Sequence, residues 1–181
     1  ATTEIYALSL HDALPIFLVC GIGGTGIVTV GAILVMAAHL DGKAAGVIDM
    51  AGLAQKGGSV LSHIRIAARP DDIHAIRLPA GGADLVLGGD LVITAGRAAL
   101  ATIRAGATRV VVDTAEVMPG PFTRDPDLRL PGERLRRALA EAAGAEQCRF
   151  VEATRLASAL FGQSIAANMV LLGVEIGRAH V

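Results

Sequence analysis

The fold is decided by the stretch Phe17–Leu40, which reads FLVCGIGGTGIVTVGAILVMAAHL. Its first four residues are apolar and run directly into glycine, as in a strand that is buried on both faces of a parallel sheet. The glycines that follow have G-x-G-x-x-G spacing, which permits a tight turn and a close approach of other groups to the backbone. Residues Ile27–Leu40 are almost continuously apolar. They predict a helix that is buried on most sides, with Thr25 as its N-cap.

The glycine turn has two interpretations. N–H groups at a helix start that face a glycine loop form an anion site, so the turn could hold a phosphate-bearing cofactor. The candidate binding residues are then Gly21, Gly23, Gly24, Thr25 and Gly26. The other interpretation is a strand-to-helix turn that binds nothing.

Asp49 raises the question of which cofactor would bind. It ends the next predicted strand, Ala44–Asp49, at about the spacing at which a dinucleotide-binding fold places its ribose-binding acid. This pattern favours an NAD(P)-binding domain of a dehydrogenase. The alternative is that Asp49 only braces the loop that follows it.

A second glycine-rich stretch, DMAGLAQKGGSVLSHIRI, runs from Asp49 to Ile66. Adjacent glycines let successive N–H groups converge into an anion-binding nest, and a lysine beside them could supply a countercharge. These candidate residues are Gln55, Lys56, Gly57 and Gly58. Residues Ser59–Ala67 predict a strand on which His63 and Arg65 share one face. That face is either an anion-binding surface or an ordinary solvated one.

Together the two stretches resemble a known family. The segments Gly21–Gly26, Gly52–Gly58 and Ser62–Arg65 are similar to the gamma domain of 2-oxoacid:ferredoxin oxidoreductases, with the closest likeness to the fused indolepyruvate type. The resemblance runs from about Phe17 to about Gly173. Further segments support it: Asp72–Arg77, Pro79–Asp84, Phe122–Asp127 and Glu152–Ala157.

The resemblance implies a fold and a reaction. The fold is an α/β, three-layer, Rossmann-like arrangement, in which a mostly parallel twisted sheet carries helices on both faces. The reaction is oxidative decarboxylation of an aryl pyruvate to an arylacetyl-CoA, with electrons passed to ferredoxin. The full enzyme would use thiamine diphosphate, Mg²⁺, iron–sulfur clusters and coenzyme A. The implied partners are the thiamine-binding and iron–sulfur domains of the same enzyme, and ferredoxin.

This chain carries few of the parts which that reaction needs. An iron–sulfur cluster takes four closely spaced thiolates, and the sequence has only Cys20 and Cys148. No Gly-Asp-Gly thiamine motif, metal-ligand set or catalytic residue can be identified. We therefore expect the fragment alone to be inactive and to expose a large apolar face for its sister domains. Its glycine loops would face the cofactor cleft, or the fragment would be a scaffold that has lost its ligand.

Composition excludes other classes of protein. The chain has 181 residues, a formal net charge of −1 and 3% aromatic residues, which does not suit a nucleic-acid-binding surface. The apolar run is too short to span a membrane, and two distant cysteines do not form a disulfide framework. We expect a cytoplasmic protein.

Both ends of the chain are unusual. Residues 1–16 and 175–181 resemble the translation of a common short-read sequencing adapter. We therefore expect the gamma domain to span residues 17–174 of a longer reading frame, with both ends as artefacts.

The rest of the chain alternates short elements, as βαβ units do. Helices are predicted at Ala83–Gly88, Arg97–Arg104, Glu133–Ala143 and Ala153–Leu172, the last with a break at Gly162. Strands are predicted at Asp90–Ala95, Arg109–Asp113 and Arg149–Glu152, and a loop at Met118–Pro131. Asp113 and Thr114 either approach the glycine loop at the carboxyl ends of the strands or cap the next turn.

Overall fold

The computed structural model describes residues 15–52, 58–115 and 131–178. Its sheet has the strand order β2-β3-β1-β4-β5-β6, and β3 alone runs against the other strands. This confirms the expected mostly parallel α/β sheet. The strands are β1 (Ile16–Ile22), β2 (Ala44–Ala51), β3 (Ser59–Ala67), β4 (Leu85–Gly88), β5 (Arg109–Asp113) and β6 (Cys148–Val151).

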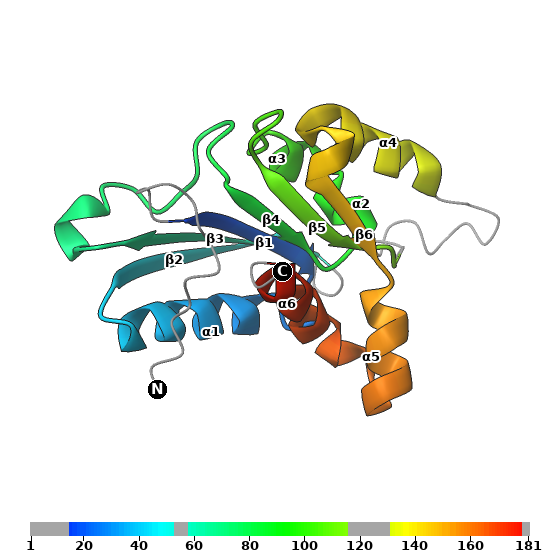
Figure 1. The fold of residues 1–181 in the computed structure, drawn as a ribbon, viewed down its shortest axis with the longest axis horizontal. Coiled ribbons are helices and arrows are strands. Elements are labelled where there is room, and N and C mark those ends of the chain that lie inside the picture. Colours follow the sequence, from blue (N-terminus) through cyan, green and yellow to red (C-terminus); the bar gives the residue numbers. More distant parts are fainter. Residues whose placement is uncertain (1–14, 53–57, 116–130, 179–181) are drawn as a thin grey trace.

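Helices cover both faces of this sheet and make three layers (Figure 1). One face is covered by α1 (Ile27–Leu40), α5 (Ala153–Phe161) and α6 (Ala167–Arg178). The other is covered by α2 (Leu91–Thr94), α3 (Arg97–Leu100) and α4 (Gly132–Ala143). Successive residues of β1 therefore enter different cores: Phe17 and Val19 pack below α1, and Leu18 and Cys20 pack below α2. A strand with apolar residues on both faces is the physical reason for the continuous apolar run in its sequence.

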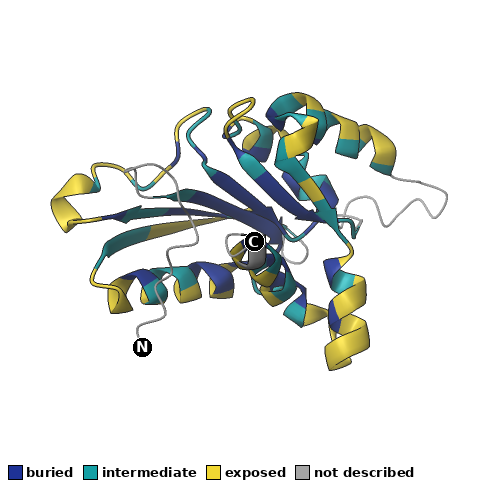
Figure 2. Cartoon of the chain, in the orientation of Figure 1, coloured by how far each residue is buried: buried dark blue, intermediate teal, exposed yellow. Residues whose placement is uncertain are grey.

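Helix α1 has the predicted bounds, but two details differ from prediction. Its N-cap is Gly26, with φ of 84°, and no side chain caps the helix. Thr25 instead turns back, and its hydroxyl donates to the carbonyl oxygen of Ile22 at 2.6 Å. The helix is also not buried on most sides, since much of α1 is exposed (Figure 2). Val28, Met36 and Leu40 are among its exposed residues, Leu40 to 81%.

Two neighbouring predictions are wrong, because the predicted helix is a strand and the predicted strand is a helix. Residues Leu85–Gly88 form the buried strand β4 rather than a helix, and Leu91–Thr94 form the short helix α2 rather than a strand. The carboxylate of Asp90 decides the second case, since its Oδ1 accepts a hydrogen bond from the backbone N–H of Ile93 at 2.8 Å. An aspartate in this position is a strong N-cap and starts a helix.

The other predicted elements are confirmed with small shifts at their ends. β3 and β5 have the predicted bounds, while α4 begins one residue early and α3 is shorter than expected. The predicted break at Gly162 is real, because Gly162 has φ of 71° and ends α5 as a left-handed C-cap. Most of the loop predicted at Met118–Pro131 lies outside the described residues.

The ends of the described chain make specific contacts. The backbone N–H of Ile16 donates to Asp84 Oδ2 at 2.9 Å. In α6, Glu175 is 4% exposed, and its Oε1 lies 3.0 Å from Arg109 Nη2 on β5. The boundaries of the natural domain at 17 and 174 stay a prediction.

The described part of the chain contains neither a membrane-spanning helix nor a cluster of metal-binding side chains. None of its helices is long and apolar enough to cross a bilayer. Nor do its His, Cys, Asp and Glu side chains gather in groups of three or more that could hold a metal ion.

Candidate functional site

The two glycine-rich stretches meet in the folded chain. The backbone N–H of Gly23, just after β1, donates to the carbonyl oxygen of Gly58, just before β3, at 2.8 Å. This contact lies at the carboxyl end of β1. The chain leaves β1 for α1 on one face of the sheet, and it leaves the neighbouring strand β4 for α2 on the other face. Such a reversal is where ligands bind in open α/β sheets. The other candidates of the second stretch, Gln55, Lys56 and Gly57, lie outside the described residues.

The loop itself needs glycine for distinct reasons. Gly24 and Gly26 have φ of 90° and 84°, in a region that side chains with a Cβ rarely adopt. Gly21 has another role, because a Cβ there would stand 2.7 Å from Cδ1 of Ile27. Its missing side chain therefore lets α1 pack closely against β1.

A groove of about 330 Å³ lies along this loop and the first turn of α1. None of its lining residues has a charged side chain, and much of its wall is glycine backbone. The first N–H groups of α1 have no acceptor within the helix and carry its positive dipole end. Electrostatically the groove suits an anion. Its lining is Ile22, Gly23, Gly24, Gly26, Ile27, Val28, Thr29, Val60 and Ile165.

Asn168 holds the inner side of the loop, and the sequence did not single it out. It comes from α6, is 6% exposed, and its Nδ2 donates to the carbonyl oxygen of Thr25. Its side chain also fills the space beside two glycines. A Cβ at Gly26 would lie 3.1 Å from Asn168 Nδ2, and one at Gly89 would lie 3.0 Å from Asn168 Oδ1. The amide thus closes the crevice under the loop, so that the open groove lies on the solvent side.

Asp49 is placed away from this groove. It lies on β2, and the antiparallel strand β3 separates β2 from β1. Its Oδ1 accepts a hydrogen bond from the hydroxyl of Ser62 on β3. In a dinucleotide-binding fold the acid follows a strand directly beside the first one. The bracing role is the one that the geometry supports.

Asp113 also has a structural role. Its Oδ2 accepts hydrogen bonds from the backbone N–H and the hydroxyl of Thr154, and its Oδ1 accepts from the N–H of Ala115 at 3.2 Å. The carboxylate therefore caps the start of α5 and the turn after β5. Thr114 is likewise engaged, since its N–H donates to the carbonyl oxygen of Val151 at 2.8 Å.

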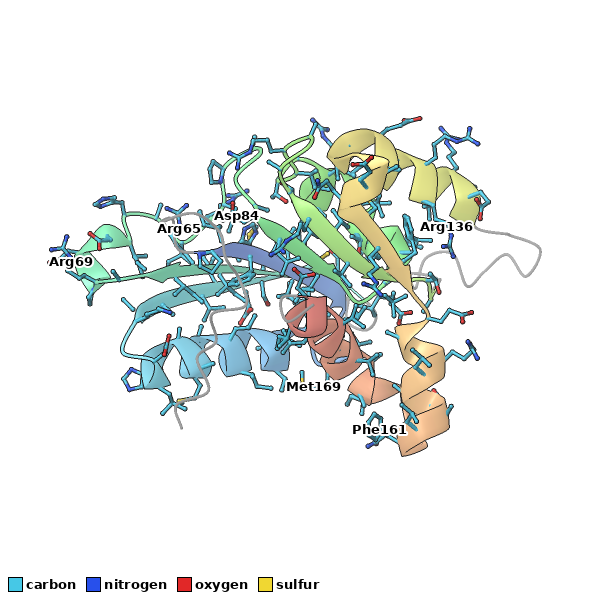
Figure 3. The ribbon with its side chains drawn as sticks, viewed as in Figure 1. Arg65, Arg69, Asp84, Arg136, Phe161 and Met169 are labelled. Carbon is cyan, nitrogen blue, oxygen red and sulfur yellow. The ribbon has the colours of Figure 1, made fainter. Side chains whose placement is uncertain are left out.

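His63 lies on neither an anion-binding surface nor a solvated face. It is 5% exposed, and its Nδ1 accepts a hydrogen bond from the backbone N–H of Leu78 at 3.2 Å. It therefore anchors the segment that crosses this face of the sheet. Arg65, its neighbour on the same face, is half-buried, and its Nε has no hydrogen-bond partner among the described residues (Figure 3).

The His63 anchor predicts a loss of stability in acid. Burial, together with the charge of Arg77, lowers the pKa of His63, so the folded chain keeps the imidazole neutral. The unfolded chain binds the proton more readily, so stability is full above about pH 6.5 and falls as the pH drops through the lowered pKa. Urea unfolding between pH 5 and 8 measures this slope.

A His63→Asn variant is the matched control. Its Oδ1 can accept the hydrogen bond from Leu78 but does not titrate in this range. It should unfold near the wild-type urea concentration at pH 8 and show a flatter pH dependence. An unchanged slope would assign the acid sensitivity to another group.

Comparison with known proteins places the chain in a family. Residues 16–180 match the model of the pyruvate ferredoxin/flavodoxin oxidoreductase family. The indolepyruvate oxidoreductase subunit IorB of Methanothermobacter thermautotrophicus is 31% identical over 160 residues, which are 86% of this chain and 74% of that subunit.

Two solved structures share the fold. The pyruvate oxidoreductase subunit PORC of Thermotoga maritima has a TM-score of 0.61 and 18% identity, over 90% of this chain and 74% of its own. The gamma subunit of the keto/oxoacid ferredoxin oxidoreductase of Geobacter sulfurreducens has a TM-score of 0.58 and 21% identity, over 90% and 75%. The resemblance inferred from the two glycine-rich stretches is confirmed. The chain belongs to the pyruvate ferredoxin/flavodoxin oxidoreductase family and has the fold of its gamma subunits.

Proposed function

We propose that this chain is the gamma part of an indolepyruvate-type oxidoreductase. The whole enzyme would convert an aryl pyruvate and coenzyme A to an arylacetyl-CoA and carbon dioxide, and would reduce ferredoxin. The support is the relative that is named an indolepyruvate oxidoreductase subunit. This chain matches 74% of the length of that subunit. We place this activity in the cytoplasm.

The role we propose for this chain is to bind the diphosphate of coenzyme A in the groove beside the glycine loop. The observation that carries the proposal is the hydrogen bond that joins Gly23 to Gly58 at the N-terminus of α1. It sets two glycine-rich segments around one groove that contains no carboxylate. Backbone N–H groups and the helix dipole bind phosphate oxygens well in such a place.

The residues present fit such a group. The N–H groups of Gly24, Ile27 and Val28 belong to the loop and the first helical turn, and would donate to diphosphate oxygens. The apolar part of the groove wall would lie against the less polar part of the ligand; it includes Val60 and Ile165. When bound, coenzyme A supplies the thiol that accepts the acyl group. Gln55 and Lys56 of the second stretch are proposed to complete the anion site.

The same geometry disfavours the dehydrogenase alternative. NAD binding would need an acid near the loop to hold the ribose hydroxyls, and Asp49, the candidate for that acid, is one strand too far away and engaged with Ser62. The proposal of a scaffold that has lost its ligand has a separate test. Replacing Gln55 and Lys56 with alanine in the whole enzyme would leave turnover and the coenzyme A KM unchanged if the domain only supports its neighbours.

An exposed apolar face gives the proposed partners a place to dock. Phe161 is the last residue of α5 (Figure 3). It is 59% exposed, and Leu160 and Ile165, close to it in the chain, are 70% and 56% exposed. Met169 on the next helix is also exposed, at 39%. Contiguous apolar surface of this kind marks a protein–protein interface. We assign Leu160, Phe161 and Met169 to contact with the thiamine-binding and iron–sulfur parts of the enzyme, and Ile165 lies where this face meets the groove.

Phe161→Asp should separate the chain from those parts. A charge placed in a desolvated interface lacks a partner and costs about 2 kcal/mol or more, which is a loss of affinity of about thirty-fold. Co-purification from cells that express the whole enzyme measures it. Glu133→Lys on α4, beneath the opposite face of the sheet, is the control and should co-purify normally. Equal recovery of the two variants would remove the α5–α6 face from the interface.

Substrate choice by the whole enzyme tests the proposed reaction. Coenzyme A-dependent ferredoxin reduction should be fastest with an aryl pyruvate such as indolepyruvate, and much slower with pyruvate or 2-oxoglutarate. Preference for either of the latter two would contradict the aryl pyruvate assignment and leave the family assignment intact.

A further inference from the structure

One peptide group of the glycine loop is held by a side chain rather than by the backbone. The N–H of Gly23 donates to the carbonyl oxygen of Gly58 at 2.8 Å, which fixes the peptide before Gly23. The N–H of Thr25 donates to the carbonyl oxygen of Ile22 at 3.2 Å, which fixes the peptide before Thr25. The next peptide differs, because the carbonyl oxygen of Thr25 accepts from Nδ2 of Asn168 and from no other group among the described residues.

The same peptide group carries the N–H of Gly26. In a trans peptide the C=O and the N–H point in opposite directions. Because the carbonyl of Thr25 points inward to Asn168, the N–H of Gly26 points outward. Gly26 lines the groove, whereas Thr25 does not, and the described part of the chain offers this N–H no acceptor. The N–H of Gly26 can therefore donate to an anion in the groove.

The backbone alone does not fix this direction. Turning the peptide over changes only ψ of Thr25 and φ of Gly26. Both the α and the β values of ψ are allowed for threonine, and glycine adopts positive and negative φ about equally readily. Gly26 has φ of 84° as the loop stands. In the reversed peptide the carbonyl oxygen of Thr25 would face the groove, where it would repel an anion.

Asn168 is rigidly placed for holding this peptide. It is 6% exposed, and Ala167 and Leu171 on the same helix are 7% and 2% exposed within the core below the sheet. The absence of a side chain at Gly89 leaves room for the amide, since a Cβ there would lie 3.0 Å from Asn168 Oδ1. Of the two ends of the amide, only the NH₂ group can donate to a carbonyl oxygen. Its contact therefore selects one of the two peptide directions.

We propose that Asn168 is a positioning residue for the diphosphate site, because it keeps the N–H of Gly26 directed at the groove. The inference rests on the proposed function and adds Gly26 to the donors of that site. Asn168 itself does not touch the ligand, since it lies on the inner side of the loop. Its amide decides whether the groove presents a donor or an acceptor at this point.

Asn168→Leu tests the proposal, since leucine is branched at the same carbon but has no donor. The crystal structure of the 181-residue variant should show the carbonyl of Thr25 turned toward the groove. In the whole enzyme the coenzyme A KM should rise about ten-fold or more, because an acceptor replaces a donor to the diphosphate. The aryl pyruvate KM, and kcat at saturating coenzyme A, should stay close to those of the wild type. A general loss of structure would not separate these quantities.

Asn168→Asp is a second variant that keeps the shape of the side chain. Its carboxylate accepts hydrogen bonds and does not donate them, so it should bind the N–H of Gly26 in the reversed peptide and raise the coenzyme A KM in the same way. Leu172→Ala is the control. Leu172 lies on the same helix and packs against the core, so the change weakens packing and should alter neither the peptide direction nor the KM.

A third measurement needs no variant. Inorganic pyrophosphate, added to the isotope-labelled wild-type chain, should shift the amide NMR signals of Gly26, Ile27 and Val28. Shifts at Ile27 and Val28 without one at Gly26 would overturn the role of Asn168 and leave the diphosphate site in place. No shift at any of the three would remove that site, and the role of Asn168 with it. A carbonyl of Thr25 that keeps its direction in both Asn168 variants would also overturn the positioning role, whatever the KM.

Discussion

Replacing Gly88 with alanine is expected to lower the free energy of unfolding by about 3 kcal/mol, near the upper end of the usual cost of overpacking a core. A Cβ at this position would stand 2.1 Å from Thr94 Oγ1 and 2.8 Å from its Cγ2. Thr94 is fully buried and cannot move aside easily. Its hydroxyl donates to the carbonyl oxygen of Asp90, and Asp90 in turn caps α2.

A double variant shows whether this close contact is the cause. Thr94→Ala removes the hydroxyl and the methyl group, so Gly88→Ala should cost much less in its presence, with a coupling energy of about 1–2 kcal/mol. Gly173→Ala is the control, because nothing lies within 4 Å of a Cβ there and α6 gains a better helix former. Urea unfolding compares the variants. A Gly88→Ala variant as stable as the wild type would contradict the packing described here.

The sequence predicts the elements that have strong local signals. The apolar run before Gly21, the strand Ser59–Ala67 and the break at Gly162 are confirmed because glycine conformation and short-range pattern decide them. The exchange of types between residues 83–88 and 90–95 has a physical cause. Both are short apolar runs, for which periodicity does not separate a buried strand from a buried helical turn. The N-cap at Asp90 was the available signal.

The candidate site was predictable only in part. The two glycine-rich stretches were expected to act together, and they are joined through Gly23 and Gly58. Asn168 was missed because its contact with Thr25 spans 143 positions of the chain, and no local pattern encodes such a contact. An amide within the apolar first half of α6 was the one hint. His63 was misjudged because alternation along a strand does not reveal that a later segment covers that face.

Thr29→Glu is expected to have the largest effect on function. Thr29 lines the groove in the first turn of α1. A carboxylate in a first helical turn interacts favourably with the helix dipole, so stability should be unchanged or rise by about 0.3–1 kcal/mol. The same charge would repel an anionic ligand in the groove. The variant therefore separates loss of binding from loss of folding.

The coenzyme A KM of the whole enzyme, measured with saturating aryl pyruvate, tests the account most directly. Thr29→Glu should raise this KM about ten-fold or more, since two like charges in a partly shielded groove repel by more than about 1.4 kcal/mol. Thr29→Gln introduces a side chain with the shape of glutamate but without its charge, and its coenzyme A KM should stay close to that of the wild type. If Thr29→Glu folds normally and keeps the wild-type KM for coenzyme A, the glycine groove does not bind the diphosphate.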